Sequence, residues 1–444
     1  MVGRSGRAPA VIVLACAASA LGAAGAAVGA AQNDPAAYVA AAEWRQWGGP
    51  SRNFSSPAVG LADRWPDAGP RVRWSRPLGL GHSSIVVDDG RLFTMYRPRT
   101  GESVEGPWAQ TESVIAMDAT SGETIWEYAY PSAPLDFSYG AGPHATPIVV
   151  GQHLFTAGTN KQLHAFDKAT GRLAWSHDLV ADFGAPPTLV RPTVKAGYAC
   201  SPIAYKDTVI LSVGGRGQAV MAFRQDDGAV VWKSGDFLVA QAAPLLVDVG
   251  GETQLVIVGG ETINGLDPDT GEVLWSHPHD TLDDMNNSMP VWGDDGVLFV
   301  SSAFNGGSRA LRLTREGSRT RVEELWFTNR LQIMFANAIR IDEYVYATSG
   351  AFGPAFLTGI HVMTGELAWQ ARGFGRSSLL AADGKAIILD EDGTLTLARL
   401  SPEGLQVLSS KQLFDTTSWT APALMGTTLY ARDRRRIVAL DLGN

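Results

Sequence analysis

The chain has 444 residues, of which 45% are hydrophobic, 18% charged and 9% aromatic, a composition typical of a globular protein long enough to bury a core. The formal charge is −9 and the longest basic run is RDRRR, Arg432 to Arg436, so we expect no nucleic-acid partner and interpret that run as a solvated hairpin. Its 49 glycines, set among short Val, Ile and Leu runs, indicate many tight turns and an all-β fold.

Residues 1–31 are expected to form a signal peptide. Positive charge in MVGRSGR is followed by an apolar stretch and by small residues with A-x-A cleavage positions, one of which ends near Ala31. We therefore expect a periplasmic or secreted protein, with lipidation at Cys16 as the alternative. No later stretch approaches eighteen uninterrupted apolar residues, so no transmembrane segment is expected in the mature chain. Cleavage would leave Cys200 without a disulfide partner.

After a leader that spans residues 32–70, the chain repeats a phrase that ends in tryptophan. VIAMDATSGETIW, LHAFDKATGRLAW and INGLDPDTGEVLW each place this tryptophan eight residues after an aspartate. The same spacing relates Arg224 to Trp232 and His361 to Trp369. A sixth copy carries four extra residues before Trp326, and a seventh has Leu408 at the tryptophan position.

Successive copies lie 39 to 57 residues apart, the length of a four-stranded propeller blade. An alternating apolar run forms one strand, and D-x-x-T-G forms a turn in which aspartate caps backbone amides and glycine takes a positive φ. The next strand ends in the tryptophan, which we expect to be a wedge between neighbouring sheets rather than a ligand contact. The predicted structural positions are Trp74, Trp126, Trp175, Trp232, Trp275, Trp326, Trp369, Asp118, Asp167, Asp267 and Asp441.

The two ends of the repeat region complement each other. RRIVALDLGN at the C-terminus reproduces the first half of the phrase through Asp441, and RVRWSRPL near the N-terminus supplies the second half with Trp74. A last blade shared by N- and C-terminal strands closes the ring and removes two exposed sheet edges. We therefore predict an eight-bladed β-propeller of four-stranded antiparallel blades over residues 71–444, folding as one domain and as a monomer.

The phrase A-x-D-x-x-T-G-x-x-x-W, as in AMDATSGETIW and GLDPDTGEVLW, resembles the repeat of the pyrroloquinoline-quinone (PQQ) propeller family. This family includes quinoprotein alcohol dehydrogenases and the BamB-type outer-membrane assembly lipoproteins. The resemblance covers the chain from about Arg71 to Asn444. EWRQWGGPSRNFSS also resembles the leader of BamB-like PQQ-repeat proteins. These motifs imply the fold, whereas the repeat itself carries no chemistry.

Aligning the innermost strands predicts one residue per blade at the entrance of the central channel. These residues are His82, His144, Ala199, Gln241, Asn287, Phe335, Arg376 and Trp419. The predicted ligand-binding residues among them are His82, His144, Gln241, Asn287, Arg376 and Trp419. The ring has one certain positive charge and no carboxylate. His82 and His144 lack an identifiable third ligand, and DPDTGE and DEDGT fall where turns are required, so no metal site and no catalytic residue are predicted.

Long connections gather on one face of the predicted propeller, at residues 96–112, 178–197, 279–287 and 349–356. Binding sites commonly lie in loops on a rigid scaffold. We therefore expect an exported, non-catalytic scaffold without cofactor, similar to BamB, that binds a protein or envelope component through this face. The alternative is a dehydrogenase that oxidises an alcohol or sugar with PQQ and Ca²⁺ in the channel. Trp419 would then lie under the quinone, Arg376 and the histidines near its carboxylates, and Asn287 with Asp283 or Asp284 near the cation.

Overall fold

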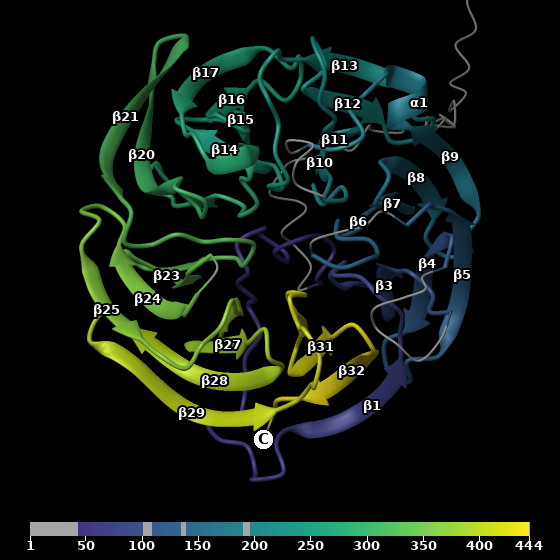
Figure 1. Ribbon diagram of the computed structural model, residues 1–444, viewed down its shortest axis with the longest axis vertical. Coiled ribbons are helices and arrows are strands. Elements are labelled where there is room, and N and C mark those ends of the chain that lie inside the picture. Colours follow the sequence, from purple (N-terminus) through teal and green to yellow (C-terminus); the bar gives the residue numbers. More distant parts are fainter. Residues whose placement is uncertain (1–42, 101–108, 135–138, 190–195, 352, 444) are drawn as a thin grey trace, which may run out of the picture.

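The computed structural model describes residues 43–100, 109–134, 139–189, 196–351 and 353–443. The predicted signal peptide and Cys16 lie outside these residues. Eight four-stranded sheets surround a central channel, with the first strand of each sheet at the channel and the last at the rim (Figure 1). The predicted eight-bladed propeller is confirmed. No helix in the described ranges is long and apolar enough to cross a membrane.

Blades 1 to 4 follow the chain in order. Blade 1 contains β2 (Val86–Asp88), β3 (Arg91–Tyr96), β4 (Thr111–Asp118) and β5 (Thr124–Pro131), and blade 2 contains β6 (Ile148–Val150), β7 (His153–Ala157), β8 (Gln162–Asp167) and β9 (Leu173–Asp178). Blade 3 contains β10 (Ile203–Tyr205), β11 (Thr208–Ser212), β12 (Val220–Arg224) and β13 (Val230–Ser234), and blade 4 contains β14 (Leu245–Val249), β15 (Glu252–Val258), β16 (Thr262–Leu266) and β17 (Val273–Pro278). A short helix, α1 (Leu179–Phe183), follows β9, and a 3-10 turn, η2 (Leu282–Asp284), follows β17.

Blades 5 to 8 complete the ring. Blade 5 contains β18 (Val291–Trp292), β19 (Val297–Ser302), β20 (Gly307–Glu316) and β21 (Arg319–Thr328), and blade 6 contains β22 (Ile339–Ile341), β23 (Tyr344–Ser349), β24 (Phe356–His361) and β25 (Leu367–Ala371). Blade 7 contains β26 (Ser378–Ala382), β27 (Lys385–Leu389), β28 (Thr394–Ser401) and β29 (Gly404–Gln412). Blade 8 contains β30 (Ala423–Met425), β31 (Thr428–Arg432) and β32 (Arg436–Asp441), and β1 (Arg71–Pro77) pairs with β32 as its outer strand.

The repeated phrase acts at the junction between two blades. In blade 1, Asp118 Oδ1 accepts hydrogen bonds from two amides of its turn at 2.8 and 2.9 Å, and Gly122 takes a φ of 73°. The indole of Trp74, from the preceding blade, lies so close to Gly122 that a Cβ there would stand 2.7 Å from the ring. Trp74 Nε1 donates to Ala119 O at 3.0 Å. In five other blades the indole N–H of the tryptophan likewise donates to a backbone carbonyl of the next blade. These bonds join Trp126 to Lys168, Trp175 to Gln225, Trp232 to Pro268, Trp326 to Val362 and Trp369 to Ser401.

The last blade is fastened to the first by a buried arginine. Arg432, at the end of β31, is fully buried and donates to Met95 O at 2.8 Å and to Gly79 O at 2.9 Å. Burial lowers the pKa of its guanidinium to about 10. The expectation that the whole run from Arg432 to Arg436 is solvated is therefore wrong for Arg432, because its side chain reaches across the blade junction rather than into water.

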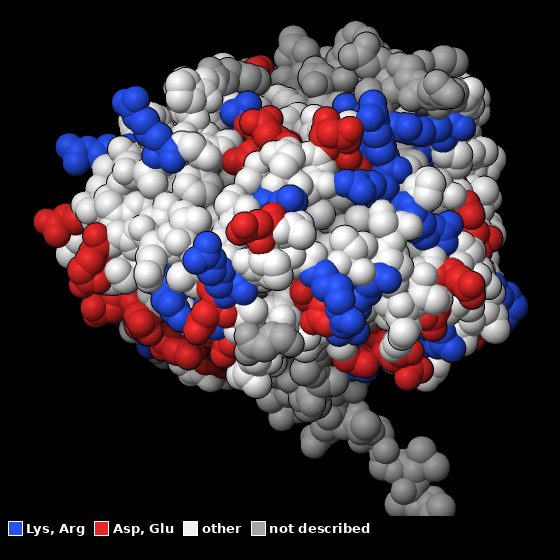
Figure 2. Space-filling view, turned by 90° about the horizontal axis from the view of Figure 1, so that it is seen from below, with Lys and Arg blue, Asp and Glu red and all other residues white. Residues whose placement is uncertain are grey.

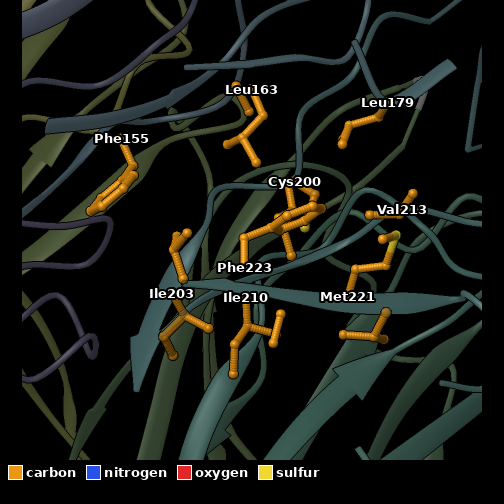
Figure 3. Close-up of a cluster of buried hydrophobic side chains, with 14 of the residues drawn as sticks. Phe155, Leu163, Leu179, Cys200, Ile203, Ile210, Val213, Met221 and Phe223 are labelled. Atoms are coloured by element: carbon orange, nitrogen blue, oxygen red, sulfur yellow. The ribbon is translucent and has the colours of Figure 1, made fainter. Parts of the chain in front are cut away.

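The buried hydrophobic side chains of the described residues form six clusters, several of which span two neighbouring blades. Figure 3 shows the cluster between blades 2 and 3, where Phe155 and Leu163 lie near Phe223 and the free Cys200. Burial raises the pKa of the Cys200 thiol.

On the side of the propeller seen in Figure 2, Lys and Arg are interspersed with Asp and Glu.

Residues 43–62 of the leader cross one face of the propeller and hydrogen-bond to the inner strands (Figure 1). Trp44 O accepts from Val87 N of blade 1, and Phe54 O accepts from Ala381 N of blade 7, both at 2.8 Å. We call this the leader face. The opposite face, called the loop face, carries the connections that enter each first strand and those that join the second and third strands.

The buried histidine His164 is expected to make the free energy of unfolding depend on pH. His164 in β8 is 6% exposed, its ring lies 4.5 Å from that of Tyr130, and burial lowers its pKa to about 4. An unfolded histidine has a pKa of about 6.5, so the unfolded chain binds the extra proton between these values and stability falls as the pH falls. The slope per histidine is about 1.4 kcal/mol per pH unit. His164→Phe is expected to reduce the loss of unfolding free energy between pH 6.5 and 4.5, measured by urea denaturation. An unchanged slope would contradict this assignment.

Candidate functional site

The central channel contains a pocket with a volume of about 120 Å³ where the first strands begin, at the loop face. Seven of the eight residues predicted for the channel ring line it. They are His82, His144, Ala199, Gln241, Asn287, Phe335 and Trp419. Each comes from the connection that enters a blade, so the equivalent position in successive repeats brings them together. This volume accommodates several water molecules or one small organic group.

An arc of aromatic rings forms one wall of the pocket. Trp419 lies at its centre, with ring centroids 5.2 Å from His82 and 4.5 Å from Phe335. His82 continues the arc to His144 at 5.3 Å, and Phe335 continues it to Tyr139 at 5.9 Å. Edge-to-face and tilted contacts at these distances stabilise the arrangement of the rings. The pocket therefore presents a firm apolar wall to whatever enters it.

The two histidines of the arc are neutral at neutral pH. Burial lowers the pKa of His144 to about 4, and it places that of His82 well below 6.5, with the nearby His144 and Arg434 acting in the same direction. The Nε2 atom of His82 is buried without a hydrogen-bond partner among the described residues. A group entering the pocket therefore meets neutral imidazoles in a region of positive potential.

Gln241 and Asn287 occupy equivalent positions but differ in their bonding. Gln241 accepts from Ala199 N and donates to Gly197 O, both at 2.8 Å, so its amide joins the entrances of blades 3 and 4. Asn287 is half-buried, and its amide makes no hydrogen bond to any described residue. Asn287 is thus the more available of the two for a ligand.

Arg376 is the one predicted ring residue that the structure does not place in the lining of the pocket. Its Nε atom lies 3.1 Å from Glu391 Oε2, and its backbone amide donates to Glu391 Oε1 at 3.1 Å. The same carboxylate accepts from Trp419 Nε1 at 2.9 Å. Glu391 therefore positions both the arginine and the central tryptophan of the arc. The sequence predicts no carboxylate at the ring, because Glu391 lies in the β27–β28 turn and not in the connection that enters the blade.

The leader contributes the floor of the pocket through Trp47. Next to it, the buried Arg52 donates to Pro244 O at 3.0 Å and to Pro202 O at 3.2 Å, which ties the leader to blades 3 and 4. Burial lowers the pKa of Arg52 to about 9. Trp47, Tyr139 and Met285 also line the pocket and were missed by the sequence analysis. Trp47 belongs to the leader motif EWRQWGGPSRNFSS, which was the one sequence feature that pointed to it. Tyr139 and Met285 occupy no repeated position, so no pattern in the sequence indicates that they line the pocket.

The donor atoms around the pocket do not match those required by a quinone held with Ca²⁺. The oxygens of Glu391 are engaged by Arg376 and Trp419. Asp283 and Asp284 are absent from the lining, although Asp283 is close enough to raise the pKa of Tyr139, after the larger effect of burial. Across the part of the chain described, no three His, Cys, Asp or Glu side chains are grouped to hold a metal ion. Two described lining residues, Gln241 and Asn287, carry an amide oxygen of the kind that Ca²⁺ prefers, and that of Gln241 already accepts from Ala199 N.

Comparison with known proteins supports the repeat assignment. The family model described as outer membrane protein assembly factor BamB matches residues 110–371, more than half of the chain. A search of curated proteins finds no match.

Solved structures share the fold at low sequence identity. BamB from Moraxella catarrhalis is 17% identical with a TM-score of 0.58, and the alignment covers 84% of this chain and 97% of that one. The quinohemoprotein alcohol dehydrogenase of Comamonas testosteroni is 14% identical with a TM-score of 0.60, and the alignment covers 93% of this chain and 83% of that one. The quinohemoprotein alcohol dehydrogenase ADHIIG from Pseudomonas putida HK5 is also 14% identical, with a TM-score of 0.58, and the alignment covers 90% of this chain and 80% of that one. The family match, on this common fold, shows that the chain belongs to the BamB family of PQQ-like propeller proteins.

Proposed function

We propose that this protein is an exported, non-catalytic propeller that binds a protein or other envelope component through its loop face. The observation that carries the proposal is the pocket in the central channel near the loop face, which has an aromatic wall and is lined by Trp47 of the leader on the other side. Such a pocket suits the insertion of an apolar side chain from a partner. The engaged oxygens of Glu391 favour this role over quinone-dependent oxidation.

Two exposed leucines on the loop face also support a binding role. Leu238 is 51% exposed and Leu282 is 57% exposed, and both lie in connections that enter a first strand. The two connections meet at Gly260, where an added Cβ would lie 3.1 Å from Leu238 Cβ and 2.9 Å from Asp284 Cβ. Exposed apolar side chains beside a pocket are typical of protein-binding surfaces.

Site-specific photo-crosslinking in intact cells tests the proposal. A benzophenone side chain at position 282 is expected to trap one defined envelope protein. The same group at Val273, which is 40% exposed on β17, the rim strand just before this connection, is expected to trap none. The trapped protein, once purified, should bind the wild-type chain and lose about tenfold in affinity for a Leu238→Glu, Leu282→Glu variant.

The opposing result is equally specific. If position 282 traps nothing, and the purified chain binds PQQ with Ca²⁺ and then oxidises alcohols in a dye-linked assay, the dehydrogenase alternative replaces the scaffold.

A further inference from the structure

Three arginines from neighbouring blades gather at one side of the pocket, on the loop face. Arg99 follows β3 in blade 1, and Arg434 and Arg435 lie in the β31–β32 connection of blade 8. Arg99 Nη2 donates to Arg434 O at 3.4 Å, which joins the two connections. We call Arg99, Arg434 and Arg435 the arginine patch.

The patch adjoins the aromatic arc directly. A Cβ built on Gly140 would lie 3.3 Å from Arg434 Nη2 and 3.5 Å from His82 Nε2, so the guanidinium and the imidazole share one small space. The positive potential of Arg434 contributes to the lowered pKa values of His82 and His144, after the larger effect of burial. The patch and the pocket therefore form one continuous surface.

Among the described residues around the patch, positive charge exceeds negative charge, although the whole chain carries −9. Asp433 Oδ1 accepts from the backbone amides of Arg435 and Arg436 at 2.7 Å, and Oδ2 accepts from the Thr416 hydroxyl at 2.6 Å. Asp415, at 3.6 Å from Arg435, is 76% exposed and forms a solvated pair. Burial and the neighbouring Arg435 lower the pKa of Arg99. Like charges held this close are stabilised by a bound anion.

We propose that the arginine patch binds carboxylates of an acidic segment in the protein partner, while an apolar side chain of the same segment enters the pocket. This inference rests on the proposed function. The cations extend from the half-buried Arg434 beside the pocket to the exposed Arg435 at the edge of the patch. An extended peptide contacts all of these positions at once, whereas a small acid contacts only one end. Arginine suits this role because its planar guanidinium binds carboxylates through two hydrogen bonds.

Fluorescence anisotropy with two labelled peptides tests the inference. One peptide carries a tryptophan followed by glutamates, and the other replaces every glutamate by glutamine. The purified wild-type chain is expected to bind the acidic peptide at least about tenfold more tightly than the neutral one, with an affinity that falls as salt rises. Arg434→Gln is expected to remove about tenfold of that affinity and Arg435→Gln about threefold, because Arg435 is more exposed.

Arg216→Gln is the matched control, since Arg216 is an exposed arginine of the loop face in the β11–β12 connection of blade 3. It is expected to leave the affinity unchanged. Equal losses for Arg216→Gln and Arg434→Gln, or equal binding of the two peptides, would overturn the inference. Binding to phosphatidylglycerol vesicles without binding to the acidic peptide would also overturn it, in favour of a lipid surface. If position 282 still traps its partner and Arg434→Gln does not weaken that complex, the proposed function stands and only the acidic recognition fails.

Discussion

A chain that ends at Arg436 is expected to lose its cooperative unfolding transition. Residues 437–444 include nearly all of β32, which lies between β31 and the N-terminal β1. Ile437, Val438 and Leu440 are all at most 1% exposed. Burial of such a side chain stabilises a fold by about 1.5 to 3 kcal/mol. Three of them approach the whole net stability of a typical domain, about 5 to 15 kcal/mol.

The loss of β32 also leaves β1 without a partner and opens the ring. The remaining hydrogen bonds between blades 8 and 1 include those of Arg432 to Met95 O and Gly79 O and that of Tyr430 to Ala119 O. Thermal unfolding followed by circular dichroism and calorimetry measures the effect. Arg71→Gln is the control in the same blade, because Arg71 pairs with Asp441 but its side chain is 74% exposed, and such a pair contributes about 0 to 1 kcal/mol. A truncated chain that melts at the full-length temperature would refute closure by β32.

Trp275→Ala is expected to lower the free energy of unfolding by about 3 to 5 kcal/mol, the usual cost of deleting a buried aromatic ring. Trp275 is 7% exposed and packs in the cluster between blades 4 and 5 with Leu298 and Leu311. Gly265 lies opposite Trp275 in the same sheet, on β16, and a Cβ there would stand 2.0 Å from Trp275 Nε1. No side chain is available to fill the cavity from that direction.

Trp275 also departs from the other tryptophans in its hydrogen bond. Its Nε1 donates to Gln254 Oε1 of its own blade at 2.8 Å, instead of to a backbone carbonyl of the next blade. The reason lies in blade 5, where β20 and β21 are ten residues each and Trp326 stands sixteen residues after its strand partner Ala310, compared with ten from Ala116 to Trp126 in blade 1. The turn is thereby displaced from the position that the other blades use. The alanine variant leaves Gln254 Oε1 without this donor, which adds to the cost.

Urea denaturation at neutral pH measures this change. Val273→Ala, two residues earlier on the same strand and 40% exposed, is the matched control and is expected to cost about 0.5 kcal/mol. A loss below about 1 kcal/mol for Trp275→Ala would contradict its position as a packed wedge.

The residues of the channel ring could be predicted from the sequence because they occupy one position that recurs in every blade. Each member stands at the same place relative to the first strand of its blade, so alignment alone brings seven of the eight residues to one pocket. Arg376 follows the same pattern, yet its side chain is held by Glu391. Glu391 lies in the turn between the second and third strands of blade 7, outside the repeated phrase, and no periodic signal relates it to Trp419 or Arg376.

The sequence by itself determined the number of blades, the order of strands and the closure by the two termini. These features depend on a local phrase, in which an aspartate and a glycine form the turn and a tryptophan packs against the next blade's glycine. Only the tertiary structure decided that Arg432 is buried at the closing junction, that Trp47 floors the channel and that Arg434 lies beside His82. Each of these contacts joins segments from different blades or from the leader. A side chain's environment there depends on the closed ring, which no local pattern encodes.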